Sequence, residues 1–268
     1  NLTAADDITT DSPTQNHVIF DSIDVGGNAH TTPGTATARQ GGLQIYAASN
    51  PSNWDMFRTG LSARKGKYYV EVTLTDYDTA AGIGVVAKDL DIKNNGTPYA
   101  GKYGWVYWTN DGKVYNNNVG YTLGGARSEG QYVGFAIDMD NGHMWVNENG
   151  TYANSGNPST GANPHITGLE KANDLGGIAF FEMRGYGGYN KWNFGQKAYT
   201  GTAPTGFGAF QQDNFPDAVN GKPDLVWIKN RDATNAHIIQ DSSRGSTKMI
   251  YSDSTSIEYT VVDGVQRF

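Results

Sequence analysis

The sequence predicts an all-β protein, with an antiparallel two-sheet β-sandwich and a second, smaller β module. Several segments, such as residues 132–139, alternate apolar and polar side chains, as strands with one buried face do. Turn signals of Asn, Asp and Gly separate these segments, and the chain contains 35 glycines. No segment shows a convincing helical period. Together these features favour a sandwich with many exposed loops.

Residues 1–42 are expected to form an irregular lead segment. They are polar and rich in turn residues, including Asp11-Ser12-Pro13-Thr14 and Pro33-Gly34. Within them only Val18-Ile19-Phe20 is apolar enough to suggest a short edge strand. The chain opens Asn-Leu-Thr without an initiator Met, so we expect a processed or internal fragment.

Residues 43–200 are expected to form the sandwich. In the strand that begins at Tyr68, alternation predicts one face made of Tyr68, Val70, Val72 and Leu74 and another made of Tyr69, Glu71 and Thr73. A hairpin is predicted where residues 132–139 meet the turn Asp140-Asn141-Gly142 and return through residues 143–147. The aromatic side chains expected in the core are Phe135, Trp145, Phe180, Trp192 and Phe194.

Residues 201–268 are expected to form the partial second β module, after a hinge-like stretch at 200–208. Four short apolar segments predict its strands, at 225–229, 237–240, 249–251 and 259–262. A segment of this length is short for a sandwich with its own hydrophobic core. We therefore expect this module to depend on contacts outside itself.

The order of these motifs resembles the SPRY branch of the concanavalin-like β-sandwiches. The motifs are Gly66–Val72, Gly82–Val86, Val133–Gly142, Asn149-Gly150 and Trp192–Gln196. A second resemblance, to phage tail-fibre and related virion proteins, covers nearly the whole chain. Its motifs are Asp11–Asn16, Pro223–Asp232 and Asp241–Gly245. This resemblance implies adhesion or virion architecture and implies no catalytic residues.

Composition narrows the possible partners. The net charge is −7 with no basic block, which argues against nucleic acid as a partner. No apolar run approaches the length that spans a bilayer, so no membrane insertion is expected. The chain has no cysteine, so the fold does not depend on disulfides or thiolate metal sites, and a bacterial or viral source is favoured. We expect no cofactor.

The residues that could suggest catalysis or metal binding have simpler structural interpretations. Glu71, Glu148 and Glu182 could supply the acid and base of a glycosidase, but that chemistry needs a fixed separation that the sequence does not show. Asp138-x-Asp140-Asn141-Gly142 resembles the start of a calcium loop, but its place between two alternating strands favours a β-turn. No nucleophile elbow, P-loop or dinucleotide motif is present, so we expect no enzyme and no metal.

Two loops, 152–164 and 185–189, are the candidate binding surface. Tyr152, Tyr186 and Tyr189 stand among Gly and Asn residues, where exposed rings could stack on sugars, and Asn190 could pair with hydroxyls. The alternative is that these rings pack on a neighbouring subunit or on their own loop. A single patch is not assured, because the two loops flank the Phe180 strand and can lie at opposite ends of a sandwich.

We therefore expect a non-enzymatic structural and adhesion module of a phage virion, most simply a tail fibre. It would be extracellular, on the tail or another external appendage, and would bind a host-surface glycan or a neighbouring virion protein. Display as a homo-oligomer would raise weak affinity per site. The alternatives are a free bacterial carbohydrate-binding lectin and a polysaccharide depolymerase.

Overall fold

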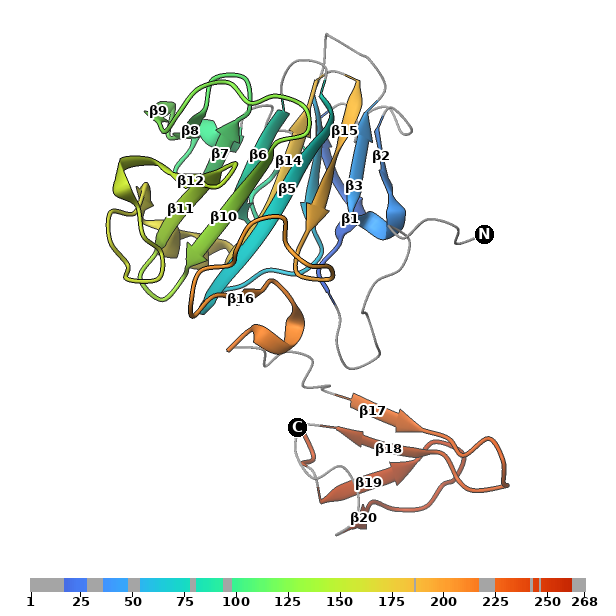
Figure 1. Ribbon diagram of the computed structural model, residues 1–268. Helices are drawn as coiled ribbons and strands as arrows, with labels where there is room; N and C mark the ends of the chain where they lie inside the picture. The colour runs from blue at the N-terminus through green and yellow to red at the C-terminus, as the bar shows by residue number, and fades with distance from the viewer. Residues whose placement is uncertain are drawn as a thin grey trace. The chain divides into compact units, whose positions relative to one another are not determined.

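A computed structural model describes residues 17–27, 36–47, 54–77, 81–93, 98–185, 187–216, 225–241, 243–245 and 247–261. The chain forms two compact units, Asn1–Asp217 and Ala218–Phe268. The first unit is a sandwich of two sheets (Figure 1). Among the described residues no helix is long and apolar enough to cross a membrane.

The first sheet has seven strands, and every neighbouring pair is antiparallel. In spatial order they are β1 (Phe20–Gly27), β4 (Asp55–Thr59), β14 (Ile178–Arg184), β6 (Ala81–Ala87), β7 (Gly104–Trp108), β8 (Lys113–Asn116) and β9 (Val119–Thr122). Gly82 allows β6 to pack closely, because a Cβ there would lie 2.6 Å from Cγ of Met183 on β14.

The second sheet has nine strands. Seven of them follow one another in the order β12 (Thr151–Tyr152), β11 (His143–Glu148), β10 (Tyr132–Asp138), β5 (Lys67–Tyr77), β15 (Gly188–Asn193), β3 (Gln44–Ala47) and β2 (Ala36–Arg39). β13 (Ile166–Thr167) pairs with β11, and β16 (Gly208–Ala209) pairs in parallel with β5. Short 3₁₀ helices lie between strands: η2 (Gln40–Gly42), η3 (Pro98–Ala100), η4 (Ala153–Ser155), η5 (Leu169–Leu175) and η6 (Gln212–Asn214).

The main core lies between the two sheets, as the alternation predicted. On β5, Tyr68, Val70, Val72 and Leu74 are all fully buried. Phe135, Phe180, Trp192 and Phe194 belong to the same buried cluster, with Trp192 and Phe194 stacked 5.5 Å apart between ring centroids. The expected antiparallel two-sheet β-sandwich is therefore confirmed.

The predicted hairpin is also confirmed, since β10 and β11 pair from Val133↔Glu148 to Asp138↔His143. The carboxylate of Asp138 accepts hydrogen bonds from the backbone N–H groups of Asp140 and Asn141 and from the Asn141 side chain. Burial opposes ionisation of Asp138, but the Asn141 and Lys67 contacts outweigh it and lower its pKa. The Asp-x-Asp-Asn-Gly motif thus closes a β-turn.

A segment after the last core strand covers the outer face of β5 and β10; we call residues 199–216 the cover segment. Figure 1 shows it in orange, crossing in front of these two strands. The Tyr199 hydroxyl donates to the backbone oxygen of Tyr69 at 2.7 Å. Further along, Phe210 is fully buried in the main core, with its ring centroid 4.9 Å from that of Phe180.

The cover segment changes the expected surface of β5. Tyr69 and Glu71, which alternation placed on the solvent face, are both buried. Trp145 is fully buried as expected, but on this outer face, where it packs with Tyr69 and Phe207 rather than in the core between the sheets. An outer face of a sheet stays solvated only where nothing packs on it, and alternation cannot reveal a distant segment that does.

Two expected boundaries differ from the structure. Within residues 1–42, expected to be irregular, β1 and β2 are strands of the two sheets, and the buried ring of Phe20 joins the main core. At the other end the sandwich unit extends to Asp217, beyond the expected limit at 200, because the cover segment is bound to it by buried rings and hydrogen bonds. The lead motif Asp11–Asn16 lies outside the described residues.

The second unit contains a four-stranded antiparallel sheet, with strands close to the predicted positions. In order these are β17 (Leu225–Ile228), β18 (Ile238–Asp241), β19 (Lys248–Tyr251) and β20 (Tyr259–Thr260). Within the described part of this unit only Gln240 is buried, and Trp227 is 62% exposed. The expected smaller β module is present as a single sheet.

Candidate functional site

Tyr152 does not lie in an open loop. It ends β12, where it pairs with Asn147, and its ring packs half-buried against the cluster of Tyr69, Ala136 and Trp145. Its hydroxyl is buried as well. Tyr152 therefore helps to hold its loop on the sheet instead of presenting a ring to solvent.

The loop around Tyr152 is tied down by two other side chains. Trp145 Nε1 donates to the Ala162 oxygen at 2.8 Å. The His165 ring bridges β11 and η4, because its Nδ1 accepts from the Val146 N–H at 3.0 Å and its Nε2 lies 2.7 Å from the Ala153 oxygen. Burial lowers the pKa of His165, which favours the neutral ring that this bridge requires.

The end of the predicted loop at 185–189 is the start of the strand β15 (Gly188–Asn193). Tyr189 and Asn190 belong to β15, and Tyr186 lies outside the described residues. Gly188 is required at the start of this strand, because its φ is +98° and a Cβ there would lie 2.1 Å from the Asp76 oxygen. Tyr189 is half-buried on the outer face, opposite Tyr46 of β3.

Asn190 points the other way, into the sandwich, which corrects its predicted role in binding. It is fully buried and its Nδ2 donates to Glu182 Oε1 at 3.0 Å. The neighbouring Trp192 Nε1 donates to Glu182 Oε2 at 2.5 Å, and Arg184 forms an ion pair with the same carboxylate at 3.3 Å. Burial raises the pKa of Glu182 to about 7 against the lowering effects of Arg184, Trp192 and Asn190.

The three candidate catalytic carboxylates lie in separate hydrogen-bond networks. Glu182 is enclosed between the sheets. Glu148, at the end of β11, accepts from the Tyr107 hydroxyl at 2.5 Å. Glu71, under the cover segment, accepts from the Tyr69 hydroxyl at 2.9 Å and from the N–H groups of Thr200 and Gly201 at 2.7 and 2.9 Å. Burial and the Glu71 carboxylate raise the pKa of Tyr69, so its phenol remains a donor.

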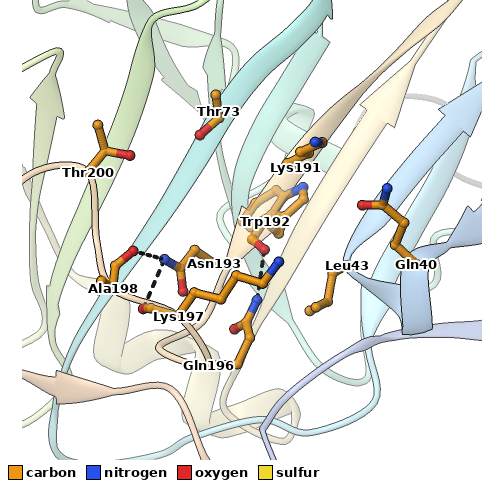
Figure 2. A pocket seen from close by; sticks show the side chains of 10 residues that line it. All are labelled: Gln40, Leu43, Thr73, Lys191, Trp192, Asn193, Gln196, Lys197, Ala198 and Thr200. Atoms are coloured by element: carbon orange, nitrogen blue, oxygen red, sulfur yellow. Dashed lines mark hydrogen bonds between the residues drawn. The ribbon is translucent and has the colours of Figure 1, made fainter. Parts of the chain in front are cut away.

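A polar hollow of about 230 Å³ lies on the outer face of the second sheet. We call it the sheet-face hollow. Figure 2 shows β15 running through it, with Thr73 and Thr200 on one side and Gln40 and Leu43 on the other. Its lining residues are Gln40, Leu43, Thr73, Lys191, Trp192, Asn193, Gln196, Lys197, Ala198 and Thr200.

Strand register explains why these residues meet. Lys191 stands opposite Gln44 on β3 and Thr73 on β5, and Arg39 on β2 stands opposite Gln44. Side chains in such a row point to the same face of the sheet. In the next row Tyr46 stands opposite Tyr189, and the Arg39 guanidinium lies 3.6 Å from the centre of the Tyr46 ring.

The turn after β15 forms one wall of the hollow. Asn193 Nδ2 donates to the Lys197 and Ala198 oxygens at 3.2 and 3.1 Å, as Figure 2 shows. Gln196 is buried, with its Nε2 donating to the Trp192 oxygen and its Oε1 accepting from the Phe194 N–H. These bonds fix the backbone from which Lys197 projects.

The binding loops predicted from the sequence therefore differ from the surface that the fold presents. Of the three predicted residues that the structure describes, Tyr189 lies beside the hollow and Asn190 points between the sheets. Tyr152 packs on the same outer face as the hollow, but β12 and β15 are separated by three strands. Gln40, Thr73, Lys191 and Lys197 were missed. The alternation of Tyr189, Lys191 and Asn193 is visible in the sequence, but the strand order that brings Gln40 and Thr73 beside them is not.

Comparison with known proteins supports the sandwich assignment. Residues 66–157 match the family model of the SPRY domain. Residues 193–268 match a domain of unknown function (DUF7483), which spans the end of β15, the cover segment and the second unit. No curated protein matches this chain.

Among solved structures, the SPRY domain of human HERC1 resembles the chain with 14% sequence identity and a TM-score of 0.48. The match covers 67% of this chain and 99% of the HERC1 domain. SPRY domains are often protein–protein interaction modules. The first unit of this chain is thus a SPRY-like β-sandwich, identified by the family match at 66–157 and by its two antiparallel sheets.

Proposed function

We propose that this chain is a non-enzymatic adhesion module of a phage virion, in a tail fibre or another external appendage, and that it binds a glycan on the host surface. The observation that carries the proposal is the outer face of β2, β3 and β15. It combines a polar hollow with two outward tyrosines, Tyr46 and Tyr189, on a rigid sheet. Aromatic rings next to amide and hydroxyl groups suit sugars, which have both apolar faces and hydroxyl groups.

The assignment to a virion is supported by the order of sequence units. A SPRY-like sandwich is followed by a module that begins Leu225-Val226-Trp227-Ile228-Lys229, the order that resembles phage structural proteins. The match at 193–268 supports the second half of that order as a recurring unit. In this setting the chain would be extracellular and displayed in several copies, which raises weak affinity per site.

The absence of catalysis is proposed from the carboxylates. Glycoside hydrolysis needs two carboxyl groups facing one substrate bond. Glu71 and Glu182 are buried and each accepts three hydrogen bonds or ion pairs, and they belong to opposite sheets. Neither side chain is placed to reach a polysaccharide.

The test uses the full chain, labelled with a fluorophore and incubated with a panel of intact bacterial strains. We expect saturable binding to at least one strain, and loss of that binding after periodate has oxidised the surface sugars. The same polysaccharide, incubated with the unlabelled chain, should yield no new reducing ends. Binding that survives periodate would indicate a protein receptor, and new reducing ends would indicate a depolymerase; either result overturns the proposal.

A further inference from the structure

We propose that the outer face of β15 and β5 binds a neutral pyranose of a host glycan, which stacks on the Tyr189 ring while two of its hydroxyls donate to the Asp76 carboxylate. The inference rests on the proposed adhesion function, and it names the residues and the ligand class within it. Three features of the described residues carry it: an aromatic ring on which nothing else stacks, a carboxylate beside that ring, and a β-bulge that positions the carboxylate.

Four side chains form one row across the outer face of the second sheet. Thr37 of β2 stands opposite Tyr46 of β3. Tyr189 of β15 stands between Tyr46 and Asp76 of β5. Directly opposite side chains on neighbouring strands have Cβ atoms about 5 Å apart, which is close to the width of a sugar ring. A pyranose that lies over Tyr189 is therefore within reach of Asp76.

Of the two tyrosines in this row, Tyr189 is the one open to a ligand. The Arg39 guanidinium lies 3.6 Å from the centre of the Tyr46 ring, and its Nε donates to the Thr37 hydroxyl at 3.3 Å, so one face of Tyr46 is covered. Within the described parts of the chain, no other ring or cation stacks on the half-buried Tyr189. The face of a tyrosine ring attracts the weakly positive C–H groups of a sugar, because the ring carries negative charge on its faces.

Asp76 supplies the polar contact and the selection by charge. It is exposed, and its carboxylate makes no hydrogen bond or ion pair with any residue that the structure describes. An ionised carboxylate only accepts, so its two oxygens suit two neighbouring sugar hydroxyls, and it repels the carboxylate of an acidic sugar. The cations on this face do not cancel that repulsion, because Arg39 is bound to Tyr46 and Thr37 and Lys191 has a partner of its own.

A β-bulge in β5 lies at the same point. Tyr189 stands opposite Asp76, but the next residue, Asn190, stands opposite Leu74, so Thr75 is the extra residue of the bulge. Bulges re-aim side chains and are over-represented next to active sites. This bulge brings Asp76 level with Tyr189.

The backbone of Asp76 is held on the side of β15. Nη2 of the buried Arg184 donates to the Asp76 oxygen at 3.3 Å. Gly188 approaches the same oxygen so closely that a Cβ there would lie 2.1 Å from it. The carboxylate therefore projects from a fixed backbone, which reduces the entropy lost when a ligand binds.

The sheet-face hollow begins in the next row, where Lys191 stands opposite Thr73. A glycan longer than one sugar can therefore continue along β15 from Tyr189 into the hollow, where Thr73, Thr200 and Gln40 bring hydroxyl and amide groups. Such groups both donate and accept, as sugar hydroxyls do. This continuity favours a glycan over a basic peptide as the partner of Asp76.

The experiment follows the amide signals of the full chain, labelled with ¹⁵N, during titration with D-glucose, D-galactose and D-mannose, each compared with its uronic acid. We expect at least one hexose to shift the amides of Asp76 and Tyr189. The hexose that binds best should bind at least about fivefold more tightly than its uronic acid, because only the acid is repelled by Asp76.

Variants separate the two contacts. Asp76→Asn should weaken hexose binding about tenfold and remove the preference over the uronic acid. Tyr189→Ala should weaken it at least about fivefold, whereas Tyr189→Phe keeps the ring and should bind nearly as the wild type does. The matched controls are Asp174→Asn, at an exposed site on η5, and Tyr121→Ala, at a residue 44% exposed on β9; both should bind as the wild type does.

Three results would overturn the inference. The first is that no hexose shifts these amides, and the second is that a uronic acid binds as tightly as its hexose or a hexa-lysine peptide binds more tightly at the same amides. The third is a correctly folded Asp76→Asn or Tyr189→Ala variant that binds the hexose unchanged.

The outcomes also separate this inference from the proposed function. If the labelled chain binds cells in a periodate-sensitive way but no hexose binds beside Tyr189, adhesion stands and this site is wrong. If a hexose binds beside Tyr189 but no strain binds the chain, the site stands and the adhesion proposal fails.

Discussion

The two units of this chain bury their apolar side chains to very different extents. In the sandwich unit two sheets face each other, and the shared core contains many fully buried residues, including Tyr68, Phe135 and Phe180. In the C-terminal unit a single sheet leaves Leu225, Trp227 and Ile228 between 49% and 62% exposed. Pairing strands satisfies the backbone, whereas stability requires a second layer to cover the apolar faces.

A binding site is more rigid on the packed sandwich unit than on the exposed C-terminal sheet. The sheet-face hollow stands on β15, whose inner face carries Trp192 against the main core. Residues positioned by a packed strand hold their geometry better than residues on a loop. A rigid face reduces the entropy lost on binding, which would favour the weak glycan binding proposed above.

The largest expected effect is from Phe135→Asp. Phe135 is fully buried between the sheets, so the change places an unpaired charge in the core. We expect a loss on the order of several kcal/mol in the free energy of unfolding, enough to unfold the sandwich. Circular dichroism and thermal denaturation measure this. A soluble variant with a near-normal melting temperature would contradict the assigned strand faces.

A smaller effect is expected from Phe210→Ala, which tests whether the cover segment belongs to the sandwich. Phe210 is fully buried and contacts the rings of Tyr68, Phe180 and Phe215. Its removal should cost about 3–5 kcal/mol in urea denaturation, as for other buried phenylalanines. A matched change at Phe207, which is only half-buried on the outer face, should cost less. If both variants lose equally little free energy of unfolding, the sandwich unit ends near residue 200 instead of at residue 217.

The third prediction concerns pH. Burial raises the pKa of Glu182 to about 7 from 4.5, so the folded state holds this proton more tightly than the unfolded state. The resulting stabilisation is fully present below about pH 4.5 and is lost as pH rises to about 7. Relative to Glu182→Gln, the wild type should lose on the order of a few kcal/mol across this range.

Urea denaturation at several pH values between 4 and 8 measures this difference. Glu129→Gln serves as the control, because Glu129 is exposed, and its curve should follow that of the wild type. If the wild type and Glu182→Gln instead keep a constant difference at every pH, the carboxyl group is not held in the buried network described here.

The smallest effect is expected in the C-terminal unit. Trp227 is 62% exposed, so Trp227→Ala should change the free energy of unfolding by less than about 0.5 kcal/mol, although it removes the largest apolar side chain of β17. Urea denaturation followed by circular dichroism measures this change in the free energy of unfolding. A loss comparable to that of a core phenylalanine would mean that another part of the molecule covers this face.

Much of the fold could be predicted because its signals are local. The alternation on β5 and the Asp140-Asn141-Gly142 turn each follow from residues close in sequence. The cover segment could not be recognised in this way, because it has no period and pairs with β5 only through the two residues of β16. Its signal was the presence of Tyr199, Phe207, Phe210 and Phe215 in a stretch otherwise rich in Gly, Pro and Thr, which suits burial better than a hinge.

The candidate site was harder to predict, for a similar reason. Tyr152 and Asn190 looked exposed because they lie near Gly and Asn, yet one packs on a sheet and the other points between the sheets. Gln40 and Lys191 meet only because β3 and β15 are neighbours, a pairing between segments far apart in sequence. Residue type indicates what a side chain can bind, but strand order decides which side chains share a face.

Native-state hydrogen exchange of the full chain tests the central claim, that the cover segment and sandwich form one cooperative unit distinct from the C-terminal sheet. The Thr200 and Gly201 amides, which donate to buried Glu71, should exchange within about tenfold of the slowest amides of β5. The slowest amides of β18 should exchange at least about 100-fold faster than those of β5. Fast exchange at Thr200 and Gly201, or exchange in β18 as slow as in β5, would contradict the account.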